Sequence, residues 1–314
     1  MTPDSRVFIA GRGGLAGSAI ARALQAHGFG DLLGPRRTEL DLRDQAAVDD
    51  FFSRQQPQYV ILAAATVGGI YANSTHPADF IRDNLQIQTN VIDAAFRHDV
   101  RKLCFLGSSC VYPRLAQQPM NESSLLTGPL EPSNECYAVA KIAGITMCQA
   151  YARQFGFNAI SVMPTNLYGP GDNFDLARSH VLPALSRKFH EAKRAGAETV
   201  TVWGTGKPRR EFLYVDDLAD AVYFLMQNYD SPDIINIGVG DDVTIAALAE
   251  LVREVTGFEG TITFDTEKPD GTPRKLLDVT KLRALGWHAQ TPLADGIRAT
   301  YDWYLAHSQD EGNG

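Results

Sequence analysis

A glycine-rich turn near the start of the chain constrains the fold more than any other feature. Residues 11–17 read Gly-Arg-Gly-Gly-Leu-Ala-Gly, directly after an apolar run at 7–10. A helical pattern follows at once, over 15–27. This order is typical of a βαβ unit that binds a dinucleotide, because backbone must approach the pyrophosphate and the helix N-terminus faces its charge. A tight strand-to-helix turn without a ligand is the alternative interpretation of these glycines.

The rest of the first half continues to alternate short apolar runs with longer helical patterns. Apolar runs stand at 59–64, 103–107 and 159–163, and helical patterns at 81–96 and 137–155. This rhythm predicts an α/β fold, a doubly wound parallel sheet of the Rossmann type with helices on both faces.

The pattern changes after residue 163, where a Gly-Pro-Gly sequence at 169–171 interrupts the periodicity. We therefore expect a nucleotide-binding domain at 1–165 and a smaller mixed α/β substrate lobe at 166–314. An apolar run at 234–238 has the composition of a buried strand, and we expect it to rejoin the sheet of the first domain.

Composition and charge exclude several classes of function. With 44% hydrophobic and 21% charged residues among 314, the chain is typical of a globular protein rather than a disordered one. A net charge of -8 disfavours nucleic acid and anionic membranes as partners. No leader is apparent, and no apolar stretch approaches the roughly 18 residues of a membrane span. The four cysteines lack metal-ligand spacing, so we expect no metal and a cytoplasmic protein with reduced thiols.

The region of the second strand favours NADP over NAD as the cofactor. A carboxylate at the end of that strand would hold the ribose hydroxyls of NAD, but the chain has Arg36 and Arg37 there. A guanidinium can bind the 2′-phosphate of NADP through charge-assisted hydrogen bonds. A solvated surface pair is the alternative interpretation.

Tyr137 and Lys141 are four residues apart at the start of a helical segment, so the phenol and the ammonium share one face. We expect the ammonium to lower the pKa of the phenol and so make it a proton donor and acceptor. Ser108 follows a strand, at the sheet edge where open α/β sheets bind ligands. By itself the Tyr-x-x-x-Lys pair could equally mark the edge of an amphipathic helix.

The glycine turn, the strand-end serine and the Tyr-x-x-x-Lys pair together resemble the extended short-chain dehydrogenase/reductase family. The resemblance covers nearly the whole chain. One of its motifs is Gly-Ser-Ser-Cys-Val-Tyr-Pro at 107–113. The other stretches that carry it are 63–70, 137–144, 163–170, 172–174, 179–181, 203–206, 210–212 and 268–278.

Within this family, the resemblance narrows to the members that act on GDP-4-keto-6-deoxy-D-mannose with NADP(H). It implies epimerisation at sugar carbons 3 and 5, followed by reduction of the 4-keto group. It also implies that Ser108, Tyr137 and Lys141 carry the reduction and that Cys110 and His180 move the protons of the epimerisation, either of them being the base. On their chemistry alone, Cys110 could be a small buried residue and His180 a polar residue that opens a helix.

The resemblance also assigns binding residues. For the substrate they are Lys188, Trp203, Arg210 and Asp270. For the cofactor they are Gly11, Gly14, Leu15, Ala16, Gly17, Arg37, Asp41, Leu42, Leu106, Gly107, Lys141, Pro164, Thr165, Asn166, Leu167 and His180. Two positions depart from the family pattern: Lys188 stands where the family has arginine, and Arg12 precedes the usual place of its arginine by one residue.

Two other functions remain open at this point. One is a reductase that acts on a different 4-keto nucleotide sugar without epimerising it, and the other is an NADP-binding redox sensor without catalysis. Sensors of that kind often lack the tyrosine and lysine found here. The family is usually a homodimer packed through helices of the sheet domain. The apolar stripe along 137–155 allows this association, although packing within one chain would produce the same stripe.

Overall fold

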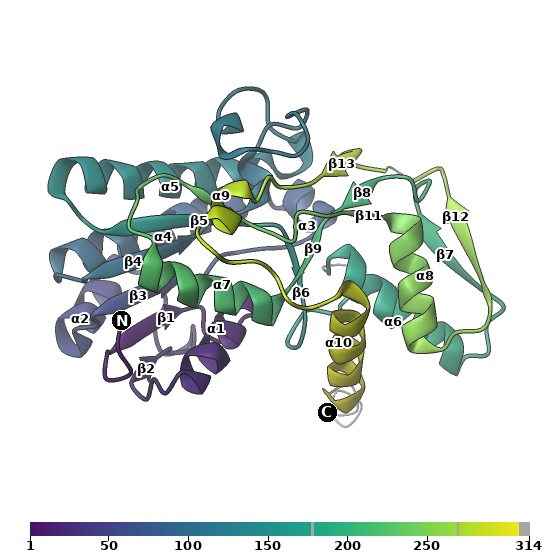
Figure 1. Cartoon of the computed structure of the whole chain (residues 1–314), viewed down its shortest axis with the longest axis horizontal. Coiled ribbons are helices and arrows are strands. Elements are labelled where there is room, and N and C mark those ends of the chain that lie inside the picture. The colour runs from purple at the N-terminus through teal and green to yellow at the C-terminus, as the bar shows by residue number, and fades with distance from the viewer. Residues whose placement is uncertain (177–178, 269, 308–314) are drawn as a thin grey trace.

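The computed structural model describes residues 1–176, 179–268 and 270–307. Its centre is a six-stranded parallel sheet in the order β10-β5-β4-β3-β1-β2 (Figure 1). The strands are β1 (Val7–Ala10), β2 (Leu32–Leu33), β3 (Tyr59–Leu62), β4 (Lys102–Leu106), β5 (Ala159–Pro164) and β10 (Ile235–Ile237). The predicted fold class, a doubly wound parallel sheet, is confirmed.

Alternate residues of the central strands face two separate apolar cores. In β1, Val7 and Ile9 join one core, while Phe8 and Ala10 join the other. The first core is closed by α1 (Leu15–Ala26) and α7 (Val215–Asn228). The second is closed by α2 (Gln45–Gln55), α4 (Pro77–Arg97) and α5 (Glu135–Phe155). Because both faces of the sheet are covered, most residues of its strands are apolar in the sequence.

The smaller lobe has a core of its own beside the sheet (Figure 1). It contains α6 (Val181–Arg194), α8 (Ile245–Thr256), α10 (Leu293–His307), and the strand pairs β6 (Asn166–Tyr168) with β9 (Phe212–Tyr214) and β7 (Thr199–Trp203) with β12 (Thr261–Asp265). A further sheet joins β11 (Val243–Thr244), β8 (Arg209–Arg210) and β13 (Arg274–Lys275). The remaining elements are short helices: α3 (Ile70–Thr75), α9 (Thr280–Ala284), η1 (Ser109–Val111), η2 (Glu122–Ser124) and η3 (Pro132–Asn134).

The chain passes between the two lobes more than once. After α6 and β9 in the smaller lobe, it returns to the sheet to form α7 and β10, and β10 pairs with β5. It then re-enters the smaller lobe at β11 and α8. The segment at 234–238 therefore completes the large sheet from a distant part of the sequence. None of the helices in the described ranges has the length and apolar character needed to cross a membrane.

A buried lysine at the start of β4 closes the end of α7. The Lys102 Nζ donates to the carbonyl oxygens of Leu225, Met226 and Tyr229 at 3.0, 3.0 and 2.7 Å. It also pairs with Asp230 at 2.9 Å. The Leu225 carbonyl also accepts from the backbone nitrogen of Tyr229 at 3.0 Å, whereas the ammonium is the donor for the last two carbonyls, those of Met226 and Tyr229.

We expect Lys102→Met to lower the free energy of unfolding by about 2–4 kcal/mol, because two buried carbonyls lose their donor and a third loses one of its two. Urea denaturation followed by circular dichroism measures this change. Lys207→Met is the matched control, since Lys207 is exposed; it should change stability by less than about 0.5 kcal/mol. Equal stability of the two variants would contradict this role of Lys102.

Candidate active site

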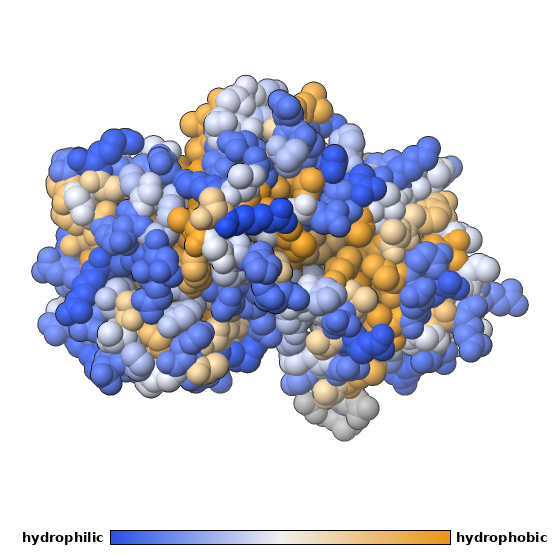
Figure 2. Space-filling view, viewed as in Figure 1, coloured by the Kyte–Doolittle hydropathy of each residue, from blue (hydrophilic) through white to orange (hydrophobic). Residues whose placement is uncertain are grey.

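A cavity of about 1550 Å³ lies at the carboxyl ends of the sheet strands and extends to the smaller lobe. Figure 2 shows apolar side chains gathered where the two lobes meet. Every residue assigned to the cofactor, the substrate or the chemistry from the sequence lines this one cavity. The fold thus brings together residues that are up to 259 positions apart, from Gly11 to Asp270.

Three of the four glycines of the first turn meet different structural requirements. Gly11 has a φ of +89°, and a Cβ there would lie 2.7 Å from the backbone nitrogen of Ala64. A Cβ on Gly17 would lie 2.1 Å from the carbonyl oxygen of Gly11, so helix α1 can approach the turn only with glycine at this position. Gly14 is the N-cap of α1 and provides no side-chain cap. The first N–H groups of α1 therefore remain for an anionic ligand, which suits a pyrophosphate.

Arg12 does not project freely into this site. Its Nη1 donates to the carbonyl oxygen of Leu32 at 2.8 Å. A Cβ on Gly34 would lie 2.3 Å from the Arg12 Cδ, so the arginine stem packs directly against this glycine. The guanidinium thus holds the end of β2 in place beside the cavity.

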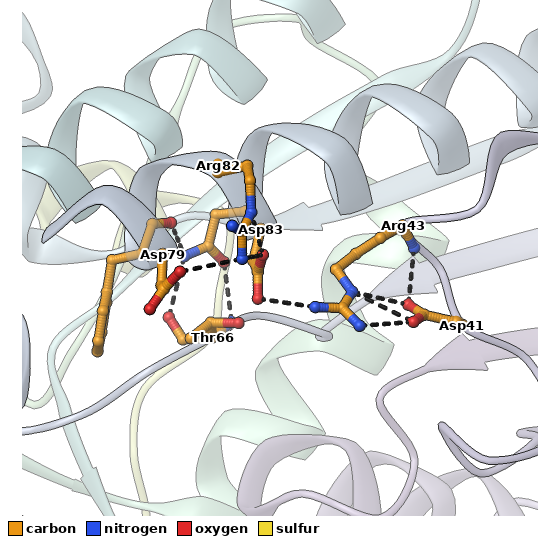
Figure 3. A network of polar contacts seen from close by, with 8 residues as sticks. Asp41, Arg43, Thr66, Asp79, Arg82 and Asp83 are labelled. Atoms are coloured by element: carbon orange, nitrogen blue, oxygen red, sulfur yellow. Dashed lines mark hydrogen bonds and ion pairs between the residues drawn. The ribbon is translucent and has the colours of Figure 1, made fainter. Parts of the chain in front are cut away.

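Asp41 is held by an arginine of its own loop. Its carboxylate accepts from the Arg43 Nε at 3.0 Å and from the Arg43 Nη2 at 2.6 Å. The hydrogen bonds from Arg43 lower the pKa of Asp41 to about 2. Figure 3 shows Arg43 between Asp41 and Asp83, and its Nη1 lies 3.2 Å from the Asp83 Oδ2. The negative charge of Asp41 is therefore compensated within the protein.

Arg37 is exposed at the edge of the cavity, and its guanidinium has no hydrogen bond or ion pair to another residue of the described chain. An unengaged cation next to a compensated carboxylate suits a phosphate rather than a ribose hydroxyl. Arg36 is also exposed, and its backbone nitrogen donates to Glu39 at 2.7 Å.

We expect Arg37→Ala to raise the KM for NADPH by about 10–100-fold, the loss of one charge-assisted hydrogen bond to a phosphate. The KM for NADH should change by less than about threefold, because NADH lacks this phosphate. Steady-state kinetics with both cofactors measures the difference, and Arg153→Ala is the matched control, since Arg153 is exposed and does not line the cavity. An equal change in the KM for both cofactors would show that Arg37 does not bind the 2′-phosphate.

Ser108, Tyr137 and Lys141 meet at the end of β4. Tyr137 and Lys141 lie on one face of α5, and the Lys141 Nζ is 5.8 Å from the centre of the Tyr137 ring. Nζ donates to the carbonyl oxygen of Leu106 at 2.8 Å. The Ser108 side chain hydrogen-bonds Tyr137 and accepts from the backbone nitrogen of Cys110 at 3.2 Å. A carbonyl oxygen placed between Ser108 and Tyr137 would meet two hydroxyl groups.

The pKa values of Tyr137 and Lys141 differ from the expectation. Burial raises the pKa of Tyr137, and the hydrogen bond from Ser108 opposes it only in part. Burial also lowers the pKa of Lys141 to about 7. The expected lowering of the phenol pKa by the ammonium is therefore wrong for the protein without ligands, because desolvation dominates in this closed site. Tyr137 consequently keeps its proton at neutral pH and can donate it.

Cys110 and His180 enter the cavity from opposite lobes. Cys110 lies in η1, directly after the strand-end serine, and it is partly exposed. His180 is the N-cap residue of α6, and its side chain is open to the cavity. Desolvation in the cleft lowers the pKa of His180, and the nearby charge of Lys275 adds to the effect. Both groups border the space into which Tyr137 and Ser108 project, as a two-base mechanism requires.

The four expected substrate residues line the part of the cavity in the smaller lobe. Trp203 is 63% exposed, and the Lys188 Nζ lies 5.3 Å from the centre of its ring. The Arg210 Nη1 donates to the carbonyl oxygen of Arg209 at 2.8 Å. Asp270 accepts from the backbone nitrogen and the hydroxyl of Thr205 at 2.6 and 2.8 Å. Asp270 therefore also shapes the loop that follows Trp203.

Two further cavity residues were not singled out from the sequence. Lys275 lies in β13, and its Nζ is 3.7 Å from the Cys110 Sγ. Asn134 is the N-cap residue of α5, and its buried Oδ1 has no hydrogen-bond partner in the described chain. Both fall within or next to motifs of the family resemblance, but only the tertiary structure places them at the cavity. Within the described ranges, no group of His, Cys, Asp or Glu side chains is arranged to hold a metal ion.

The fold and the cavity define the class of enzymes that use a nicotinamide dinucleotide at the carboxyl edge of an open α/β sheet. The NAD dependent epimerase/dehydratase family matches residues 7–238, and the chain belongs to this family. The predicted resemblance to the extended short-chain dehydrogenase/reductases is thereby confirmed.

Individual relatives and a solved structure are similar to this chain over nearly its whole length. The chain is 62% identical to GDP-L-fucose synthase 1 of Arabidopsis thaliana over 96% of this chain and 94% of the relative. It is 54% identical to GDP-L-fucose synthase of Escherichia coli, covering 98% and 99% of the two chains. Among solved structures, GDP-mannoheptose C4 reductase from Campylobacter jejuni with NADP bound aligns with a TM-score of 0.90. That alignment has 42% identity and covers 97% of this chain and 99% of the reductase.

Proposed function

We propose that this chain converts GDP-4-keto-6-deoxy-D-mannose to GDP-L-fucose with NADPH, by epimerisation at carbons 3 and 5 and reduction at carbon 4. The observation that carries the proposal is the 62% identity, over nearly the whole chain, to a relative named for this activity. The cavity supports it, since the groups for both reactions border one space.

The cavity residues fit NADP(H). Gly11, Gly14 and Gly17 leave room for the pyrophosphate at the N-terminus of α1, and Arg37 provides the free cation for the 2′-phosphate. When bound, NADPH supplies the hydride for the 4-keto group. We infer that 1–165 forms most of this cofactor site, together with Asn166, Leu167 and His180, and that 166–314 provides most contacts to the nucleotide sugar.

The epimerisation requires two groups that move protons. The 4-keto group acidifies the hydrogens on carbons 3 and 5, so a base removes one of them to give an enolate. An acid on the opposite face then returns a proton with inverted configuration. Cys110 and His180, which border the cavity from different lobes, suit these two roles.

In the reduction, Tyr137 gives its proton to the keto oxygen as the carbonyl becomes an alcohol. Ser108 donates a hydrogen bond to the same oxygen and orients it. Burial raises the pKa of Tyr137, so its proton is available at neutral pH. The cations Lys188 and Arg210 suit the diphosphate of the substrate, and exposed Trp203 offers a flat apolar surface.

Two properties of the assembly follow the family. We infer a homodimer through α4 and α5, supported by the exposed Val139 and Phe155 on α5. The Phe155 ring stacks on Phe96 of α4, with centres 4.6 Å apart, which extends this apolar surface. We also place the enzyme in the cytoplasm, since all four cysteines are free.

The test is NADPH oxidation with GDP-4-keto-6-deoxy-D-mannose in deuterated water, followed by mass spectrometry and NMR of the product sugar. Oxidation with deuterium at carbons 3 and 5 and inverted configuration supports the proposal. Oxidation without deuterium favours a reductase that acts at carbon 4 without epimerising the sugar; the C. jejuni neighbour is named a C4 reductase. Absence of oxidation would overturn both and leave the sensor hypothesis.

A further inference from the structure

We propose that Lys275 is a positioning residue for the epimerisation: its ammonium orients the Cys110 sulfur and stabilises the thiolate that takes part in proton transfer. The role in epimerisation rests on the proposed function. The contact between Lys275 and Cys110 does not depend on the proposed function, because it exists in the protein without substrate.

The two side chains meet across the cleft. The Lys275 Nζ donates a hydrogen bond to the Cys110 Sγ over 3.7 Å, within the range for sulfur acceptors. Cys110 belongs to the sheet domain and Lys275 to β13 of the smaller lobe. A hydrogen bond from an ammonium to an anion is about twice as strong as one to a neutral group, so this contact favours the thiolate over the thiol.

The backbone around Lys275 is fixed from both lobes. In the smaller lobe, β13 pairs in parallel with β8, which sets Lys275 beside Arg210, and the Glu211 nitrogen donates to the Lys275 carbonyl at 3.2 Å. On the other side, the nitrogen of Leu276 donates to the Gln118 Oε1 at 2.9 Å. The Met120 nitrogen donates to the Leu276 carbonyl at 2.7 Å. Lys275 is therefore held in place by its neighbours on both sides of the cleft.

The carboxylate of Glu211 adds to this fixation. It is fully buried and accepts from the backbone nitrogens of Leu277 and Gly240 at 2.9 and 2.7 Å. A Cβ on Gly238 would lie 2.3 Å from its Oε1, so the carboxylate packs against the residue that directly follows β10 of the large sheet. The strand that carries Lys275 is thus tied to the sheet domain, and the distance to Cys110 depends on both lobes.

The charged groups around the thiol act in the same direction. Cys110 faces the cations Lys275 of β13 and Arg210 of β8, and the phenol of Tyr137 from α5. At neutral pH Tyr137 is uncharged, and Lys275 and Arg210 are both positive. Lys275 also lies near His180 and disfavours a second cation there. One lysine therefore lies close to both proton-transfer groups.

The first test measures the reactivity of Cys110 in the full-length protein without cofactor or substrate. The rate of alkylation by iodoacetamide at Cys110 is followed from pH 5.5 to 9.5 by mass spectrometry of its peptide. We expect Lys275→Met to move the midpoint of this profile upward by about one pH unit or more, since one unit corresponds to the loss of a modest charge interaction. Lys275→Arg keeps the charge and should restore at least half of the shift.

The control for local charge is Lys207→Met, because Lys207 lies in the loop before β8 but does not line the cavity. Its profile should match the wild type. Circular dichroism and thermal melting show whether each variant is folded. A profile of folded Lys275→Met that coincides with the wild type would overturn the proposal.

The second test connects the contact to turnover. With GDP-4-keto-6-deoxy-D-mannose in deuterated water, Lys275→Met should incorporate deuterium at carbons 3 and 5 at least about tenfold more slowly, with the NADPH dissociation constant unchanged. The loss should appear in kcat, and the pH dependence of exchange should move with the alkylation profile. A rise in substrate KM alone, with normal thiol reactivity, would make Lys275 a substrate anchor instead. If wild type exchanges no deuterium, the proposed function fails while the alkylation result still stands.

Discussion

Tyr137→Phe should lower the rate of 4-keto reduction by about 10²–10⁴-fold, the usual contribution of a positioned general acid. The phenylalanine ring keeps the packing against its neighbours but has no proton to give. Epimerisation should persist, because Cys110 and His180 are unchanged. Single-turnover NADPH oxidation measures the first reaction, and deuterium incorporation into recovered substrate measures the second.

Tyr151→Phe provides the matched control for this variant. Tyr151 lies on the same helix, but its hydroxyl donates to Asp93 at 2.8 Å and it is not among the cavity residues. Its removal should leave reduction within about twofold of the wild type. Reduction at the normal rate in Tyr137→Phe would remove Tyr137 from the proton-donor role, and a parallel loss of deuterium exchange would point to damage of the whole site.

Cys110→Ser should slow deuterium incorporation at carbons 3 and 5 by about 10²-fold or more, because a hydroxyl is a far weaker base than a thiolate near neutral pH. The side chain keeps nearly the same shape, so binding of NADPH should stay within about twofold of the wild type. Fluorescence titration of NADPH and NMR of the exchanged sugar give these two quantities.

Cys136→Ser is the corresponding control. Cys136 is partly exposed at the start of α5, one residue before Tyr137, and is not among the residues that line the cavity. Exchange in this variant should proceed normally. If Cys110→Ser weakened NADPH binding as strongly as exchange, the thiol would have a structural role near the cofactor and would not serve proton transfer.

The fold was predictable because its signals are local. Most of the predicted strands and helices agree with the structure to within about two residues. Gly11 and Gly17 of the first turn leave no room for a Cβ, as the motif implies. Among the elements that were predicted, α4 differs most from the structure: it begins at Pro77, four residues before the expected start at 81. Proline is favoured in the first turn of a helix, so Pro77 itself indicates the earlier start. The periodicity of apolar residues does not indicate it.

The electrostatics of the site could not be predicted from spacing. A spacing of four residues places Tyr137 and Lys141 on one face, but it does not reveal that Lys141 is buried and Tyr137 half-buried. The engagement of Asp41 by Arg43 and the approach of Lys275 to Cys110 likewise depend on tertiary packing. The strands β8 and β13 have only two residues each, too short for any periodicity, so the pairing that places Lys275 was not recognisable.

The return of the chain to the large sheet has a consequence for synthesis on the ribosome. Until residues 235–237 have emerged, the edge of β5 that later pairs with β10 has no partner, and until α7 has emerged one face of the sheet is only partly covered. An unpaired edge and an uncovered apolar face favour association with other chains. The nascent dinucleotide domain therefore cannot reach its native state independently, and most of the smaller lobe's first segment must be translated before the cofactor site can close.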